Sequence, residues 1–230
     1  MWNGKMKAVT FSYDDGVEQD IRFIELLDRY GLRGTFNLNL GLQSRSNTFR
    51  KSEIIVRHID RADIPAVYAN HEVAGHTMTH PHLEALDDET VREEIWACQD
   101  GLRQLTGRAV TGMAYPYGTY DGRVVEIAQE VGVRYARTTE QTERFDVPRD
   151  LLRLATTCRH ANPRTLDLAR AFVEMEPASP QLFYLWGHTY EFDEFGSWGM
   201  IEEICKTLAG RPDVFYGTNA EVLLGQGEGG

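Results

Sequence analysis

Short apolar runs alternate along the chain with segments whose apolar residues recur every three or four positions. The runs are typical of buried strands, and the wider spacing is typical of amphipathic helices. Strands are therefore predicted at 7–13, 34–40, 73–74, 110–115, 134–137, 152–157, 182–187 and 214–217. Helices are predicted at 19–30, 89–105, 123–131, 163–174 and 200–208, with one more at 54–59 that Ser52 would cap.

The alternation of strands and helices predicts an α/β fold with a parallel sheet, closed into a barrel. The length of 230 residues suits one such domain, because α/β barrels use a chain of this size for a single core. Seven or eight strands are available, and periodicity alone does not choose between these numbers. In a barrel, the side chains that follow the strand ends gather at one face, where barrel enzymes place their chemistry.

Two short polar motifs stand at predicted strand ends. Asp14 and Asp15 follow the first strand, while His76 and His80 are separated by three residues. Two histidines and a carboxylate form a metal-binding face that leaves positions open for water and substrate. A second adjacent carboxylate is redundant as a ligand, whereas a metal-activated water needs a base to take its proton. Together the motifs predict a catalytic metal site rather than a structural one.

Four stretches resemble, in order, the motifs of the polysaccharide deacetylase (NodB-homology) family, which is carbohydrate esterase family four. They are Phe11-Ser12-Tyr13-Asp14-Asp15-Gly16, the stretch 72–83 around the histidines, Tyr115-Pro116-Tyr117-Gly118, and Leu185-Trp186-Gly187-His188. The resemblance covers roughly residues 5–218, the expected core of the single domain at 1–230, and leaves 225–230 as a glycine-rich tail that we expect to be frayed. It implies an irregular (β/α)7-type barrel and a hydrolase that removes acetyl groups from an N- or O-acetylated carbohydrate.

The resemblance also implies a role for each motif residue. Asp15, His76 and His80 are expected to hold one divalent metal ion, for which zinc is expected and cobalt, manganese or nickel are alternatives. Asp14 is expected to act as the base. His188 is the expected general acid, and the backbone N–H of Tyr117 is the expected donor to the oxyanion.

The chain departs from the family pattern at two places. Ala114 stands where the third motif carries an Arg, and the acidic fourth motif is not recognisable. Arg137 is a candidate to replace the missing Arg, and Glu191 and Asp193 are candidates for the missing acid that orients His188. Further substrate contacts are expected from residues near the strand ends, namely Tyr115, Pro116, Arg137, His160 and Trp186.

Because of these departures, two other functions stay open. One is an amidohydrolase of the same family that acts on a small non-sugar amide or cyclic imide. The other is a catalytically impaired, carbohydrate-binding relative. A metalloprotease is disfavoured because Thr77-Met78-Thr79 places no Glu between the histidines, and an iron oxygenase of the two-histidine type leaves Asp14 without a role.

Charge and composition narrow the partners. A net charge of −11 and the lack of a basic cluster make nucleic acid an unexpected partner. No segment has the ~18 apolar residues of a membrane span, and no secretory signal is recognised, so no membrane partner and a cytoplasmic protein are expected; a trimmed secreted protein is the alternative. Three distant cysteines argue against a disulfide framework. The oligomeric state stays open.

Overall fold

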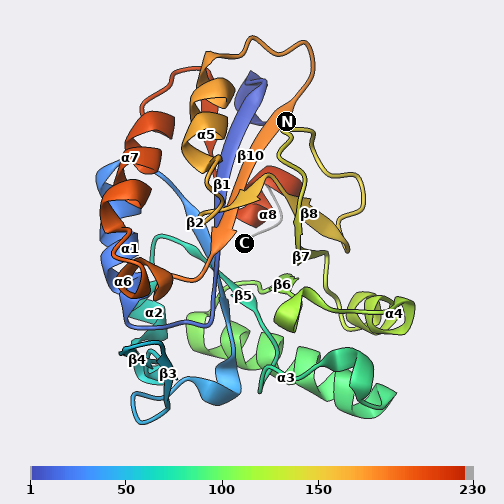
Figure 1. Cartoon of the computed structure of the whole chain (residues 1–230). Coiled ribbons are helices and arrows are strands. Elements are labelled where there is room, and N and C mark those ends of the chain that lie inside the picture. The colour runs from blue at the N-terminus through green and yellow to red at the C-terminus, as the bar shows by residue number, and fades with distance from the viewer. Residues whose placement is uncertain (1, 226–230) are drawn as a thin grey trace.

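A curved, mostly parallel sheet runs through the centre of the computed structural model, which describes residues 2–225 (Figure 1). The predicted tail therefore lies outside the described residues, apart from Gly225. The strands are β1 (Lys7–Asp14), β2 (Gly34–Leu38), β3 (Thr48–Lys51), β4 (Ile54–Arg57), β5 (Glu72–Gly75), β6 (Gly112–Ala114), β7 (Tyr135–Gln141), β8 (Leu154–Thr156), β9 (Cys158–Arg159), β10 (Gln181–Gly187) and β11 (Val214–Tyr216).

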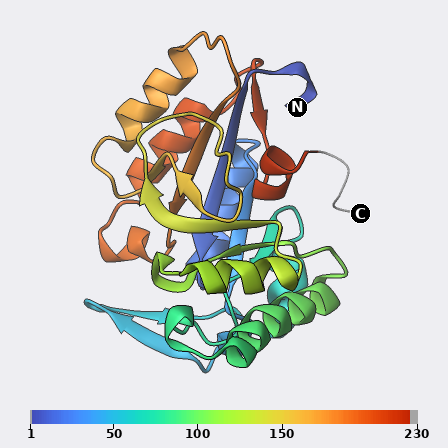
Figure 2. The same cartoon turned by 90° about the vertical axis from the view of Figure 1, so that its right-hand side faces the viewer.

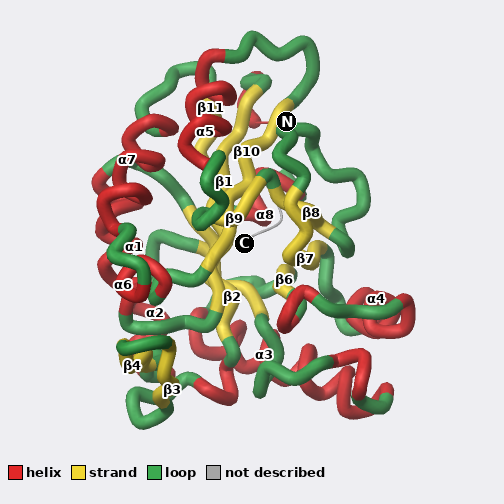
Figure 3. The backbone as a smooth tube through the Cα atoms, in the orientation of Figure 1, coloured by secondary structure: helices red, strands yellow, loops and turns green. Residues whose placement is uncertain are grey.

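The helices surround this sheet, as the colouring by secondary structure shows (Figure 3). They are α1 (Gln19–Arg29), α2 (Ile64–Val67), α3 (Asp88–Thr106), α4 (Gly122–Glu130), α5 (Thr165–Glu174), α6 (Glu191–Glu194), α7 (Trp198–Leu208) and α8 (Asn219–Leu223). Side-chain caps fix three of the starts, because Asp87, Asp121 and Thr218 accept from the backbone N–H groups of Thr90, Val124 and Glu221. In the described part of the chain, no helix is long and apolar enough to cross a bilayer.

The sheet returns on itself through one interrupted strand. Its order is β8-β7-β6-β5-β2-β1-β10-β9, and β8 and β9 are consecutive pieces of the stretch 154–159. The first piece pairs with β7, the second pairs with β10, and the Thr157 N–H between them donates to the Tyr184 carbonyl at 3.0 Å. Counting this stretch once gives seven positions, which confirms the irregular (β/α)7-type barrel. In addition, β11 pairs with residues 7–9 of β1, which precede the residues 11–14 that pair with β2.

Alternation along β1 decides which side chains enter the barrel. Phe11 and Tyr13 face outward and pack with Phe23 of α1. Ser12 faces inward, where its hydroxyl accepts hydrogen bonds from the side-chain amides of Asn37 and Asn219 at 3.0 and 3.2 Å. Because successive side chains alternate, the next inward position is 14, so the strand itself delivers a carboxylate to the interior of the barrel.

The predicted helix at 54–59 is wrong. Residues 48–57 form the antiparallel hairpin β3–β4, whose two-residue turn places Ser52 at φ +47°. Its strands are anchored to the segment after β1, since the Glu18 N–H donates to the Arg57 carbonyl at 2.9 Å. The β-branched run Ile54-Ile55-Val56 favours a strand and explains the difference. The hairpin, light blue in Figure 2, projects at the same end of the molecule as α3.

Other boundaries differ from the prediction by a few residues. The strand predicted at 134–137 continues as β7 to Gln141, and the one predicted at 152–157 is divided into β8 and β9. The short helix α6 was not predicted. All three cysteines are free and buried, in agreement with the absence of a disulfide framework.

Asp20 ties the start of α1 to the loop that follows β10. Its carboxylate is fully buried and accepts hydrogen bonds from the hydroxyls of Thr189 at 2.5 Å and Tyr68 at 2.7 Å. Burial raises the pKa of Asp20 to about 7, although these hydrogen bonds act in the opposite direction. The folded state therefore favours the neutral acid, and its ionisation at higher pH opposes folding.

This raised pKa predicts a pH-dependent stability. The contribution of Asp20 is fully present below the ordinary Asp pKa and is lost as the pH rises through 7. Asp20→Asn stays neutral at every pH, so the free energy of unfolding of the natural protein should fall relative to that of the variant between pH 5 and pH 8. Denaturant unfolding of both proteins at these two pH values measures the difference. Parallel pH dependences would show that Asp20 does not titrate in this way.

Candidate active site

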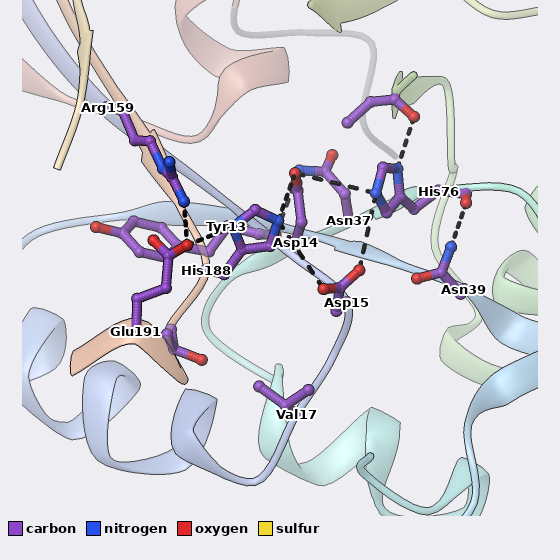
Figure 4. Close-up of polar contacts among 12 residues, drawn as sticks. Tyr13, Asp14, Asp15, Val17, Asn37, Asn39, His76, Arg159, His188 and Glu191 are labelled. Atoms are coloured by element: carbon purple, nitrogen blue, oxygen red, sulfur yellow. Dashed lines mark hydrogen bonds and ion pairs between the residues drawn. The ribbon is translucent and has the colours of Figure 1, made fainter. Parts of the chain in front are cut away.

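The predicted site residues meet in one cleft at the carboxyl ends of the strands. The cleft is bordered by the candidate metal ligands Asp15, His76 and His80, and by Asp14 and His188. The hairpin β3–β4 forms part of one wall, and the loop after β6 forms part of another. The close-up in Figure 4 shows Asp14, Asp15, His76 and His188 turned toward a common centre.

Backbone geometry after β1 separates the two carboxylates. Asp15 takes a φ of +81°, and its N–H donates to the Asn37 carbonyl of β2 at 3.0 Å. Gly16 follows with a φ of +65°, and an added Cβ there would lie 2.6 Å from the Leu38 side chain. Only glycine fits this turn without a clash. The turn leaves Asp14 buried in the barrel and Asp15 at the cleft.

The loop 76–80, which carries both predicted histidine ligands, is held by contacts with β6 and α3. The Nδ1 of His76 lies 2.8 Å from the Ala114 carbonyl, which leaves Nε2 directed at the cleft, 3.9 Å from Asp15 Oδ1. The Thr79 hydroxyl and N–H donate to the Glu94 carboxylate of α3 at 2.7 and 2.9 Å. His80 takes a φ of +60° and packs its ring against that of His76 at 4.7 Å. A hydrogen bond to the second ring nitrogen is the usual way in which proteins orient a metal-ligating histidine.

Asp15, His76 and His80 fit a divalent metal ion. One ligand atom from each residue lies within 4.8 Å of the others. Burial and the neighbouring His76 lower the pKa of His80 to about 4, so its imidazole is neutral at pH 7 and has a lone pair to offer. Two imidazoles and one carboxylate suit zinc and its first-row neighbours. The structure thus assembles the donor set that the sequence predicted.

Asp14 forms a buried ion pair with Arg137 of β7. The guanidinium Nη2 donates to Asp14 Oδ2, while Asn37 donates to Oδ1 at 2.8 Å. Burial alone would raise the pKa of Asp14, but the charge of Arg137, with those of His76 and His188, lowers it to about 2. Arg137 is 1% exposed and stacks on Trp186, with its guanidinium carbon 4.5 Å from the ring centre. It lies beneath Asp14 and does not border the cleft, and its expected substrate contact stays a prediction.

His188 lies across the cleft from the histidine loop. Its Nε2 is 4.0 Å from Asp14 Oδ2 and 3.9 Å from Asp15 Oδ2, and its Nδ1 is 3.4 Å from Glu191 Oε1. Burial opposes the imidazolium, but contact with Glu191 and the charges of both aspartates raises the pKa of His188 above its ordinary value. A raised pKa favours the protonated ring, which is the form that a general acid requires.

Glu191 is itself held by two neighbours. Arg159 donates to Glu191 Oε1, and His160 Nε2 lies 3.0 Å from Oε2. Burial would raise the pKa of Glu191, yet His160, His188 and Arg159 lower it well below its ordinary value. The carboxylate is therefore ionised and faces His188. Asp193, the other candidate, instead accepts from the Trp198 indole at 2.7 Å.

The remaining expected contacts divide into two groups. Tyr117 borders the cleft with a φ of +58°, and its ring lies against His80 at 4.4 Å; Trp186 also borders the cleft. Tyr115 is 1% exposed, and its hydroxyl donates to the Leu152 carbonyl, so its side chain belongs to the core. His160 is equally buried and stacks on Tyr13, and Pro116 is buried. Tyr115 borders the cleft with its hydroxyl directed into the core, whereas His160 and Pro116 do not border it; the substrate contacts expected of these three residues stay predictions.

The structure also adds polar residues that the sequence analysis missed. Asn37 contacts Asp14, Asn39 donates to the His76 carbonyl, and Arg159 contacts Glu191. Asn37 and Asn39 lie at and just beyond the end of β2, beside the metal motifs, and this position was the available signal. The partner of Arg159 depends on α6, which was not predicted.

Comparisons with known proteins agree with this geometry. A family model described as polysaccharide deacetylase matches residues 3–136. The chain belongs to the polysaccharide deacetylase family. Chitin deacetylase 2 of Cryptococcus neoformans is 25% identical over 151 residues, which are 62% of this chain and 33% of that protein. A peptidoglycan-N-acetylglucosamine deacetylase of Listeria monocytogenes is 24% identical over 60% of this chain and 26% of its own. The chain thus spans about a third or less of the curated relatives it matches.

Solved structures share the fold. The chitin deacetylase from Colletotrichum lindemuthianum aligns with a TM-score of 0.65 and 18% identity over 98% of this chain and 91% of its own. A family 4 carbohydrate esterase from Streptomyces lividans, in complex with acetate, has a TM-score of 0.57 and 18% identity over 93% and 92%. A family 4 pseudoenzyme from Bacillus anthracis has a TM-score of 0.55 and 17% identity over 95% and 66%. Members with this fold therefore include catalysts and pseudoenzymes.

Proposed function

We propose that this protein is a metal-dependent hydrolase that removes acetyl groups from an N- or O-acetylated carbohydrate. The observation that carries the proposal is the position of two ionisable groups around the metal-type donors. Asp14 lies 4.0 Å from the His76 Nε2, and His188 lies 3.9 Å from Asp15. A base and an acid that face one metal site are what hydrolysis of an acyl bond requires.

The side chains would divide the work as follows. Asp15, His76 and His80 would hold the ion. When bound, a divalent ion polarises a carbonyl and makes a coordinated water more acidic. The ionised carboxylate of Asp14 would accept the proton of the attacking water, and Arg137 and Asn37 would hold that carboxylate in place. The backbone N–H of Tyr117 would donate to the oxygen that gains negative charge, a contribution of roughly 3 kcal/mol in comparable sites.

His188 would then give its proton to the departing nitrogen or oxygen. Glu191 supports this role because its contact with Nδ1 raises the pKa of His188 and leaves Nε2 directed at Asp14 and Asp15. An amine departs poorly without a proton, whereas an activated phenol departs unprotonated. The pair His188–Glu191 therefore favours a catalyst over an impaired relative. Glu191 gives His188 the charged partner that the missing fourth motif would otherwise provide.

The proposal predicts metal-dependent release of acetate. The purified protein should release acetate from at least one of four substrate classes, namely chitooligosaccharides, peptidoglycan fragments, acetylated xylan and N-acetyl monosaccharides, and a chelator should abolish the release. His76→Ala should lose stoichiometric metal and turnover together, because Nε2 of His76 faces Asp15 in the donor set. Elemental analysis and acetate assays measure both. His82→Ala is the matched control for metal content, because His82 is an exposed histidine outside that set; its ring stacks on Tyr117, so its turnover is not used as a control.

Retention of stoichiometric metal by His76→Ala would show that the ligand assignment is wrong. No acetate from any of these substrates, together with hydrolysis of a cyclic imide, would favour the amidohydrolase instead.

The pair His188–Glu191 predicts that the rate loss on removing either side chain depends on the leaving group. His188→Ala should reduce the rate on an N-acetyl sugar by ~10²- to 10⁴-fold, with a much smaller loss on an aryl acetate. Glu191→Gln should show the same asymmetry to a lesser extent, because it removes a charge that raises the pKa of His188. Equal losses on both substrates, accompanied by a lower melting temperature, would make both residues structural.

A further inference from the structure

Lys51 of the hairpin is an exposed cation at the border of the cleft that the proposed catalytic residues do not contact. Phe49 and Lys51 both border the cleft, whereas Arg50 between them does not. This agrees with strand geometry, in which alternate side chains share a face. The Lys51 Nζ lies 5.6 Å from the centre of the Tyr190 ring, and that ring lies 5.2 Å from His188. One aromatic ring thus separates the ammonium from the proposed general acid.

The hairpin is fixed in this position. The Ser52 hydroxyl at its turn donates to Glu194 Oε1 of α6 at 2.6 Å. At its other end, the backbone of Val17 bridges to His58, and Arg57 pairs with Glu18 at 3.4 Å. Lys51 is consequently presented to the cleft by a strand with anchors at both ends. A cation placed on such a support needs little ordering when it meets a ligand.

The charges that border the cleft are otherwise matched. Asp14 pairs with Arg137, Glu191 pairs with Arg159, and Asp15 belongs to the metal-type donors. Among the described residues, Lys51 forms no ion pair with a carboxylate, and its ammonium rests on the aromatic face of Tyr190. The whole protein carries a net charge of −11, so an anionic ligand would be repelled unless a local cation received it.

We infer that Lys51 forms a subsite for a carboxylate carried by the sugar, so that the preferred substrate is an acidic acetylated carbohydrate. This inference rests on the proposed deacetylase function and narrows its substrate class. The carboxylate would lie on the same side of the cleft as His188, which is the side of the departing amine or alcohol. Lys51 contributes recognition and takes no part in the chemical step.

The test compares two substrates that differ in one group. One is a disaccharide of N-acetylated amino sugars that carries a lactyl carboxylate, and the other is the same disaccharide with that carboxylate reduced to the alcohol. The natural protein should prefer the acid. Lys51→Met keeps the length of the side chain, and it should lower kcat/KM for the acid about 2- to 5-fold, mainly through KM. Its effect on the alcohol should be several-fold smaller, and the preference of the natural protein should shrink as salt is added.

Arg50→Met is the matched control, because it removes the neighbouring cation from the other face of the same strand. It should keep the preference for the acid. Equal kcat/KM of the natural protein for both disaccharides, or equal losses in Lys51→Met and Arg50→Met, would overturn the subsite while leaving the deacetylase function intact. Release of acetate from neither disaccharide by the metal-loaded natural protein would also overturn the subsite, whereas release from none of the four substrate classes named above would count against the proposed function itself.

Discussion

The buried ion pair between Asp14 and Arg137 is the interaction on which the site depends. Asp14 is 3% exposed and lies beside a second carboxylate, so an ionised form at this position needs a positive partner. Arg137 provides it from β7, and Asn37 provides a second donor from β2. Removing one partner from a buried pair leaves the other uncompensated, which typically costs about 3–5 kcal/mol. The position of the Asp14 carboxylate, the proposed base, therefore depends on how β2 and β7 are placed relative to β1.

The position of Arg137 also accounts for Ala114. These two residues are register partners on the adjacent strands β6 and β7. The resemblance places the family's Arg at position 114, so the same guanidinium enters the barrel one strand further along. The small side chain of Ala114 is fully buried, and its carbonyl is free to accept from His76. Arg137 thus gives Asp14 a cationic partner although position 114 does not.

The acid side is built in a similar way. Glu191, held by Arg159, faces His188 although the acidic fourth motif is missing, and Trp186 contacts an arginine in each half of the site. The guanidinium carbons of Arg137 and Arg159 lie 4.5 and 5.5 Å from the Trp186 ring centre. The indole thereby restricts both arginines, namely Arg137 beside Asp14 and Arg159 beside Glu191. Cation–π contacts of this kind are worth about 0.5–2 kcal/mol each, so they act mainly by fixing orientation.

Local patterns made part of this structure predictable. The spacing of His76 and His80, the pair Asp14-Asp15 and the strand before His188 are features of short segments, and periodicity identified most strands and helices. A helix was predicted over 54–59, where the structure has β4. The three consecutive β-branched residues at 54–56 favour a strand, but the run is too short to show the alternation that identifies one. The partners Asn37, Arg159 and Glu191 depend on register and on α6, which are set by packing between distant segments. Arg137 was only a candidate, because its neighbour in space is 123 residues away.

The most direct test of this account is the activity of Arg137→Gln, measured together with its metal content. Gln keeps a hydrogen-bond donor but removes the charge that holds Asp14 ionised and oriented. We expect the variant to bind metal with unchanged stoichiometry and to lose at least about 100-fold in kcat, a loss typical of a misplaced general base. Its thermal unfolding shows whether the variant is still folded. Unchanged kcat in a folded, metal-loaded Arg137→Gln protein would contradict the account.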